Sequence, residues 1–247
     1  MDRRDFLIRA IGLPLGLRLA AAGVRPPADP VTLFLAGDVM TGRGIDQVLP
    51  HFGDPSLFEP YVRTATEYVE LAERKSGPIP RPVDFTYIWG DALEELERVA
   101  PAARIVNLET SVTTSDDRWP RKQIHYRMHP ANVPCLTAAG IDCCALANNH
   151  VLDWGSAGLL ETLDTLQAAG IQTAGAGRDL EEAMRPAVLE AGIDQRVLVF
   201  GFGAASSGIP AAWAAGESRP GVNFLPDVSR RSLERVAESV HAVKRRG

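Results

Sequence analysis

Runs of hydrophobic residues that end in polar side chains recur along the sequence. Three of them, residues 31–36, 104–106 and 141–146, are apolar enough to predict strands buried in a sheet. The polar side chains that follow these runs are Asp38, then Asn107 and Glu109, then Asn149 and His150. Because the C-terminal ends of parallel strands lie along one edge of a sheet, we expect these side chains to converge on one metal or one anion.

The segments between and after these runs carry apolar residues at helical spacing or in short strand-like stretches. This pattern predicts helices over residues 57–75, 91–99, 131–139, 156–169, 179–184 and 227–246. It also predicts strands over residues 173–177, 188–190 and 196–201, and a long loop or edge hairpin over residues 115–129. Strands that alternate with helices indicate an α/β fold around a largely parallel or mixed sheet.

The N-terminal residues predict an export signal. Arg3-Arg4, followed by Phe6-Leu7, resembles a twin-arginine signal, and the apolar stretch 11–22 ends in three alanines typical of a cleavage site. We therefore expect a signal peptide over residues 1–22, a linker over 23–30, one domain over 31–247, and a periplasmic or other extracytoplasmic location. An amphipathic first helix is the alternative.

Composition narrows the function further. The chain of 247 residues has a formal net charge of -5, which argues against a nucleic-acid partner. No apolar stretch approaches the roughly 20 residues that a membrane-spanning helix needs. The three cysteines, Cys135, Cys143 and Cys144, predict neither a disulfide framework nor a cysteine zinc site, so we expect them to be small buried residues.

The first two strand ends carry candidate metal ligands. A carboxylate at Asp38, between a buried strand and a glycine-rich turn, suits a hard or borderline cation. Asn107 and Glu109 are two residues apart on a strand, so their side chains point to the same face. Each motif has an alternative explanation when it is taken alone. Asp38 can be a turn aspartate that bonds its own backbone, and Asn107 and Glu109 can be polar residues at a strand end.

The third strand end carries candidate catalytic chemistry. The carbonyl oxygen of Asn149 can ligate a metal, and His150 can donate a proton to a leaving group or bind a phosphate. Asp153, three residues later, can orient His150. The alternative is an asparagine-rich turn that starts a helix.

A basic segment is the candidate substrate contact. Its cationic side chains are Arg118, Arg121, Lys122 and Arg127, accompanied by His125 and His129. Such a segment in an acidic chain suits an anionic substrate. A solvated loop explains it equally well.

Together these motifs resemble the CapA-type (poly-γ-glutamate capsule synthesis) proteins of the calcineurin-like metallophosphatase superfamily. The matching stretches are residues 37–40, 106–109, 139–142, 147–150, 162–163, 169–171 and 175–177, together with Arg127, Pro130, Asn132, Val133, Asp153 and Gly155. The resemblance implies an α/β fold, a metallophosphatase-like four-layer α/β sandwich with mixed sheets. It also implies a divalent metal (Mn, Fe or Zn) at the strand ends.

The resemblance assigns a role to each candidate residue. Asp38 corresponds to the first metal ligand, and Glu109, with Asn107, to the bridging carboxylate. Asn149 and His150 resemble the Asn-His pair that ligates metal and assists the leaving group. The substrate contacts are expected from Arg121, Lys122, Arg127 and Asp153.

Two departures shape the expected function. Met40 stands where superfamily phosphatases have a histidine, and the family's later His-Trp-Gly and Gly-His-x-His-like motifs do not occur in these residues. We therefore expect the N-terminal portion of such a domain, incomplete at the C-terminus.

Three functions stay open. The first is metal-dependent phosphoester hydrolysis in capsule or poly-γ-glutamate biosynthesis. The second is a non-catalytic exported protein that binds or assembles an anionic polymer. The third is a fragment without a function of its own, which predicts a broad, non-cooperative melt. The expected partners are an anionic polymer or phosphoester substrate and a membrane-associated capsule synthesis complex.

Overall fold

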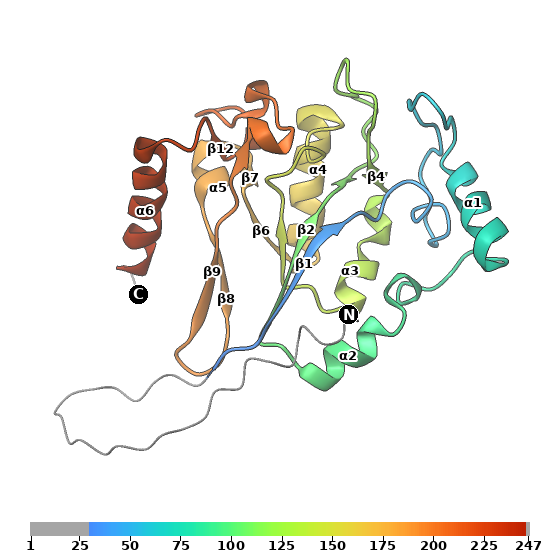
Figure 1. The fold of residues 1–247 in the computed structure, drawn as a ribbon, viewed down its shortest axis with the longest axis horizontal. Coiled ribbons are helices and arrows are strands. Elements are labelled where there is room, and N and C mark those ends of the chain that lie inside the picture. Colours follow the sequence, from blue (N-terminus) through green and yellow to red (C-terminus); the bar gives the residue numbers. More distant parts are fainter. Residues whose placement is uncertain (1–29, 246–247) are drawn as a thin grey trace, which may run out of the picture. The chain divides into compact units, whose positions relative to one another are not determined.

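The predicted strands pair into a parallel sheet in the order β1-β2-β5-β6 (Figure 1). Its strands are β1 (Leu33–Val39), β2 (Ala103–Leu108), β5 (Cys143–Ala145) and β6 (Gln172–Ala174). The computed structural model describes residues 30–245, so the predicted signal peptide lies outside the described residues. Since all four strands run in one direction, their C-terminal ends meet at one edge, as predicted.

Helices and short strand pairs surround this sheet. The helices are α1 (Thr66–Ser76), α2 (Ala92–Val99), α3 (Pro134–Ala138), α4 (Gly155–Ala168), α5 (Leu180–Met184) and α6 (Arg230–Lys244). The remaining strands are β3 (Ser111–Val112), β4 (Arg127–Met128), β7 (Ala176–Gly177), β8 (Ala187–Glu190), β9 (Arg196–Val199), β10 (Gly203–Ala204), β11 (Gly221–Val222) and β12 (Phe224–Leu225). β8 with β9 and β7 with β11 are antiparallel, so the expected α/β class with mixed sheets is confirmed.

The larger hydrophobic core lies between the sheet and its helices. Val106 and Cys144 point from the sheet toward Leu136 of α3 and Leu163 of α4, and all four side chains are buried. The three cysteines are buried and free, as the sequence predicted. This packing fixes the sheet edge from which the polar loops emerge.

A second, smaller core lies on the opposite face of the sheet. Cys143 and Ala174 pack there against Ala187 and Leu189 of the β8–β9 hairpin. No backbone ladder joins β8 to β6 within residues 30–245. Instead, the side-chain amide of Gln172 donates to the Val188 carbonyl at 2.7 Å and accepts from the Val188 N–H at 3.0 Å. The Gln172 side chain therefore makes the two hydrogen bonds that the backbone of a neighbouring strand residue would otherwise make.

The predicted helix over residues 57–75 is wrong in its first half. Helix α1 begins only at Thr66, and Pro60 lies in the non-helical segment before it. The preceding segment forms a loop closed by the Leu57 N–H, which donates to the Arg63 carbonyl at 2.8 Å. The apolar spacing that suggested a helix there belongs to a folded loop.

The predicted strand over residues 173–177 is divided in two. Gly175, with φ of +91°, separates β6 from β7. A Cβ at this position would lie 2.7 Å from the Ala147 Cβ and 2.8 Å from the Gly201 Cα. Only glycine fits this close approach of three segments, and the chain turns there into an antiparallel pair.

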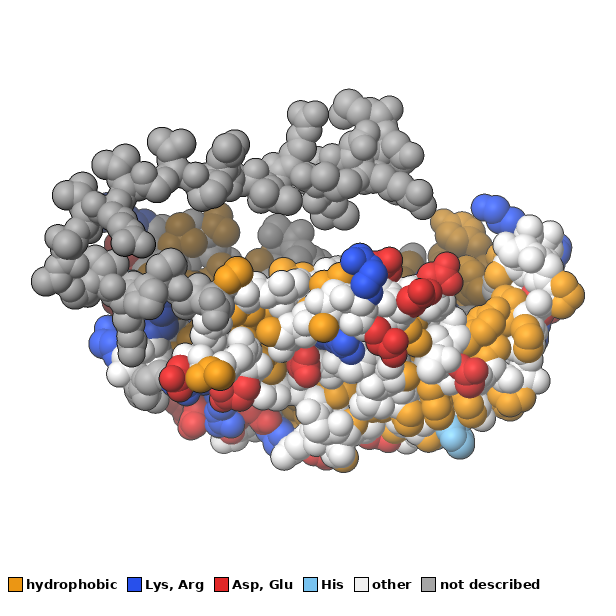
Figure 2. Space-filling view, turned by 90° about the horizontal axis from the view of Figure 1, so that it is seen from below, with side chains coloured by type: hydrophobic (Ala, Val, Ile, Leu, Met, Phe, Trp, Pro, Cys, Tyr) orange, Lys and Arg blue, Asp and Glu red, His pale blue; other side chains and the backbone are white. Residues whose placement is uncertain are grey.

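The surface at the N-terminal ends of the strands, opposite the polar edge, is mixed in character. Figure 2 shows acidic, basic and hydrophobic side chains interspersed there. β1 is an edge strand, and its Leu35 is 67% exposed.

Within residues 30–245, no helix is long and apolar enough to span a membrane.

Candidate functional site at the sheet edge

An asparagine bridges two carboxylates at the ends of β1 and β2. The Asn107 Nδ2 donates to Asp38 Oδ1 at 2.8 Å and to Glu109 Oε2 at 2.6 Å. A register irregularity between Ala36 and Asp38 sets Asp38 opposite Asn107 on the neighbouring strand. The structure thus brings together the first two predicted strand ends, with the amide nitrogen of Asn107 facing the carboxylates.

The negative charge of Asp38 acts on the neighbouring carboxyl group of Glu109. Burial raises the pKa of the Glu109 carboxyl, the hydrogen bond from Asn107 opposes that rise, and the negative charge of Asp38 adds to it. Glu109 is 8% exposed, whereas Asp38 is open to solvent. A cation placed between them would relieve this repulsion.

Asn148 ties the third strand end to the second. Its Nδ2 donates to the Asn107 Oδ1 at 3.0 Å and to the Leu108 carbonyl at 2.8 Å. Its Oδ1 accepts the backbone N–H of His150 at 3.0 Å. Asn148 therefore uses both ends of its amide to set the height of His150 above the sheet, a role that its place in the Asn-Asn-His run did not reveal.

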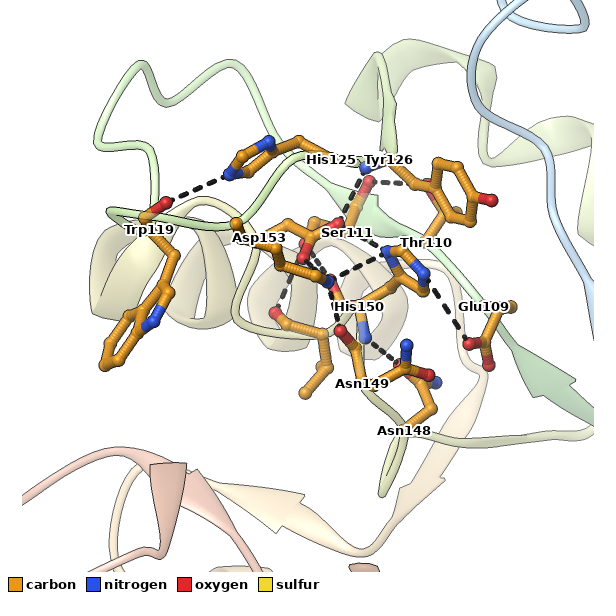
Figure 3. Close-up of polar contacts among 12 residues, drawn as sticks. Glu109, Thr110, Ser111, Trp119, His125, Tyr126, Asn148, Asn149, His150 and Asp153 are labelled. Atoms are coloured by element: carbon orange, nitrogen blue, oxygen red, sulfur yellow. Dashed lines mark hydrogen bonds and ion pairs between the residues drawn. The ribbon is translucent and has the colours of Figure 1, made fainter. Parts of the chain in front are cut away.

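His150 lies between two acids (Figure 3). Its Nδ1 is 2.6 Å from Asp153 Oδ2, and its Nε2 is 4.0 Å from Glu109 Oε1. The ring stacks on Tyr126, with centroids 3.8 Å apart and planes inclined by 17°. Asp153 also accepts the Tyr126 N–H at 2.7 Å, so one fully buried carboxylate positions both rings.

Lys122 belongs to this network. Its Nζ contacts Asp153 and the Asn149 carbonyl, and it lies 3.1 Å from the His150 Nδ1. Burial lowers the pKa of the Lys122 ammonium, and the charge of Asp153 opposes that shift. Lys122 is thus a partly buried countercharge to Asp153, behind the imidazole.

An aromatic and cationic stack continues from His150 away from the sheet. The Arg43 guanidinium carbon lies 4.6 Å from the ring centroid of Tyr126 and 4.8 Å from that of Tyr68. Arg43 Nη2 pairs with Glu59 Oε1 at 2.6 Å, and the Tyr68 hydroxyl donates to Glu59 at 2.6 Å. The sequence signal for this stack is only the Gly-Arg-Gly turn.

The remaining basic candidates lie apart from the imidazole. Arg127 is engaged by Asp116 at 2.9 Å and Asp54 at 3.8 Å, and its guanidinium carbon lies 4.0 Å from the Trp154 ring centroid. Arg121 is exposed and makes no ion pair with any described residue. Of the predicted substrate contacts, Arg121 thus has a free charge, while Lys122, Arg127 and Asp153 are held by neighbours.

The oxygen ligands at this edge are of the chemical type that binds a divalent cation. Asp38 and Glu109 supply carboxylate oxygens, and the side chain of Asn149 makes no hydrogen bond to other described residues, which leaves its carbonyl oxygen free. Within the described part of the chain, no three His, Cys, Asp or Glu side chains are grouped to hold a metal. The fit therefore rests on two carboxylates and an amide oxygen.

The parallel sheet with its mixed outer strand pairs and flanking helices defines a protein of the α/β class. Residues 32–247 match the family described as Bacterial capsule synthesis protein PGA_cap. The chain belongs to this family, which has a metallophosphatase-like fold, so the resemblance to CapA-type proteins is confirmed.

Relatives of the chain carry names from the same field. A probable polyglutamine synthesis accessory protein of Mycobacterium tuberculosis is 51% identical over 220 residues, which cover 89% of this chain and 58% of that protein. The capsule biosynthesis protein CapA of Bacillus anthracis is 23% identical over 85% of this chain and 43% of its own length. The PGA biosynthesis protein CapA of Bacillus subtilis is 26% identical over 81% and 45%. The chain thus spans little more than half of the mycobacterial relative.

Proposed function

We propose that this chain provides a divalent-cation site for phosphoester hydrolysis in a capsule or polyglutamate synthesis protein. The observation that carries the proposal is the pair of carboxylates, Asp38 and Glu109, joined by one amide and facing the Nε2 of an oriented histidine. The names of the relatives support the biological setting.

Each residue then has a distinct task. Asp38, Glu109 and the side-chain Oδ1 of Asn149 would hold the cation, which when bound would neutralise charge on a phosphoryl group. Asn107 and Asn148 keep the carboxylates and the imidazole in register. The His150 Nε2 gives a proton to the departing ester oxygen, while Asp153 at Nδ1 fixes the ring and stabilises its protonated form.

Calorimetric titration with Mn²⁺ tests the cation site directly. We expect binding to the unaltered protein and its loss in Asp38→Ala and Glu109→Gln. The matched control is Glu97→Gln, an exposed carboxylate on α2, which should bind as the unaltered protein does. Equal Mn²⁺ binding in all variants would contradict the site.

Hydrolysis of bis(p-nitrophenyl) phosphate tests the reaction separately. Replacement His150→Asn should keep Mn²⁺ binding and lower the hydrolysis rate by about 10²–10⁴-fold, the usual contribution of a proton donor. Hydrolysis that survives both Asp38→Ala and Glu109→Ala rejects the proposal.

A second function, binding of an anionic polymer, is favoured by the free charge on Arg121. Arg118 is also exposed and lies over the ring of Phe58, 3.8 Å from its centroid. Both arginines belong to the polar loop that contains Lys122. Polyglutamate binding that falls with added salt and weakens in Arg118→Ala and Arg121→Ala, but not in the exposed control Arg231→Ala, supports this function. Binding that is independent of salt counts against it.

A further inference from the structure

Strand β1 has one bare face. Its Phe34 and Ala36 pack against the larger core. Leu33 and Leu35 alternate with them along the strand, so they point to the opposite face of the sheet. Leu33 is 38% exposed and Leu35 is 67% exposed, and a Cβ on Gly37 would meet no atom within 4 Å. Parallel strands with a continuous apolar sequence are normally covered on both faces, so β1 has the sequence of a buried strand without the cover.

The β8–β9 hairpin covers only the other half of this face. It packs on Cys143 of β5 and Ala174 of β6, which are buried. The hairpin lies on the β6 side of the sheet, and β1 is the edge strand at the other end (Figure 1). On β2, between them, Ile105 is already partly exposed. The smaller core therefore ends before it reaches β1.

The outer edge of β1 is also open in the described part of the chain. There β1 pairs with β2 alone, so one row of its backbone N–H and C=O groups has no ladder partner. Natural edge strands are commonly protected against further pairing by lysine, by proline or by a short length. β1 has seven residues, and its only charged one is Asp38 at the end of the strand. Face and edge together leave an apolar strand without a neighbour.

The bare face leads to the candidate site. Leu35 pairs with Ile105 of β2. Beyond the register irregularity in β1, Asp38 pairs with Asn107. Because paired residues of neighbouring strands point to the same side of a sheet, Leu35 and Asp38 share this face. A segment that covers Leu35 would therefore continue toward the solvent-exposed side of Asp38.

We propose that this surface, formed by Leu33, Leu35 and the free edge of β1, binds a polypeptide segment with an apolar face. The segment corresponds to the part of the relatives that lies outside the matched region. This chain matches 58%, 43% and 45% of the lengths of the three relatives, so each of them has a long further segment. A polypeptide both buries the leucines and supplies backbone groups to the edge of a strand. The inference does not depend on the proposed hydrolysis, because it uses neither the cation nor His150.

Thiol labelling tests whether Leu35 becomes covered. The variant Leu35→Cys places an accessible thiol on this surface, whereas the three native cysteines are buried. Its reaction with a maleimide is compared with that in a chimera in which residues 31–247 replace the matched region of the mycobacterial relative. The thiol should react at least about tenfold more slowly in the chimera, since a covered thiol reacts only after local opening. Leu71→Cys, from a leucine on α1 that is 48% exposed, is the matched control and should react equally in both proteins.

The intact mycobacterial relative repeats the test without a new junction. A cysteine at the position that aligns with Leu35 should be protected there, and mass spectrometry of peptides locates the label. A freely reactive thiol in the intact relative, or equal rates for Leu35→Cys in this chain and in the chimera, overturns the proposal. Protection of Leu35→Cys in this chain by itself, growing with protein concentration, would assign the surface to a second copy of the chain instead.

Discussion

The ring of His150 lies almost parallel to the ring of Tyr126, with centroids 3.8 Å apart. Hydrogen bonds to the ring nitrogens act in the plane of the imidazole. The stack on Tyr126 adds a contact on the flat face of the ring. Tyr126 is itself covered by Arg43 on the same stack. The orientation of the candidate catalytic group thus depends on a residue from a loop that follows β3.

This stack gives a first prediction. Tyr126→Ala should lower the free energy of unfolding by about 1–2 kcal/mol, since aromatic pairs contribute about 0.5–1.5 kcal/mol beyond the area they bury. The ring-current shift of the His150 imidazole protons in the NMR spectrum should disappear as well. Tyr126→Phe keeps the ring and is the control: it should preserve the shift. An unchanged shift in Tyr126→Ala would show that the rings are not stacked in solution.

The charge of Asp153 gives a second prediction. Asp153→Asn should lower the free energy of unfolding by about 3–5 kcal/mol, because it leaves Lys122 partly buried without its countercharge. Replacing both, Asp153→Asn with Lys122→Met, should cost less than the sum of the single changes. Urea unfolding of the four proteins measures this coupling, and strictly additive losses would contradict it.

The two neighbouring asparagines should behave differently. Asn148→Ala leaves the Leu108 carbonyl and the His150 N–H unpaired in a buried place, so the free energy of unfolding should fall by about 2–4 kcal/mol. Asn149→Ala removes no side-chain hydrogen bond to any described residue and should change stability by less than about 0.5 kcal/mol. Chemical denaturation compares them. Similar decreases in the free energy of unfolding for the two variants would mean that the hydrogen bonds of Asn148 do not stabilise the loop.

The cysteines give a prediction about reactivity. Burial raises the pKa of Cys135 and of Cys143 to about 12, and it raises the pKa of Cys144 too. A thiol that stays protonated and covered reacts slowly. The native protein should therefore not react with a disulfide reagent at neutral pH, and three thiols should react after unfolding in urea. Rapid reaction of a native thiol would show that one core opens readily.

The sequence predicted the sheet edge well for a physical reason. Runs such as residues 141–146 are apolar because both faces of the strand are covered, and parallel strands end together whatever the loops do. That rule brings Asp38, Glu109 and His150 to one edge, and the register shift in β1 and the hydrogen bonds of Asn148 then set their positions. Family membership supports the α/β class independently.

The parts that the sequence did not predict depend on long-range contacts. Tyr126, Arg43 and Glu59 meet through loops whose local patterns carry no signal for the contact. The helix expected from residue 57 fails because a folded loop can show helical spacing by chance, and Pro60 was the contrary signal. The export signal, the cation and the capsule complex stay predictions.

Gln172 has a consequence for how the molecule opens. In residues 30–245 the side chain of Gln172 hydrogen-bonds β8 to β6, and no backbone ladder joins these two strands, so the β8–β9 hairpin can part from β6 without breaking a ladder of the central sheet. We therefore expect the hairpin to open locally before the central sheet does. The amide protons of the β8–β9 hairpin should exchange with solvent before those of β2 and β5. The hydrogen bonds of the Gln172 side chain mark the contact that opens first.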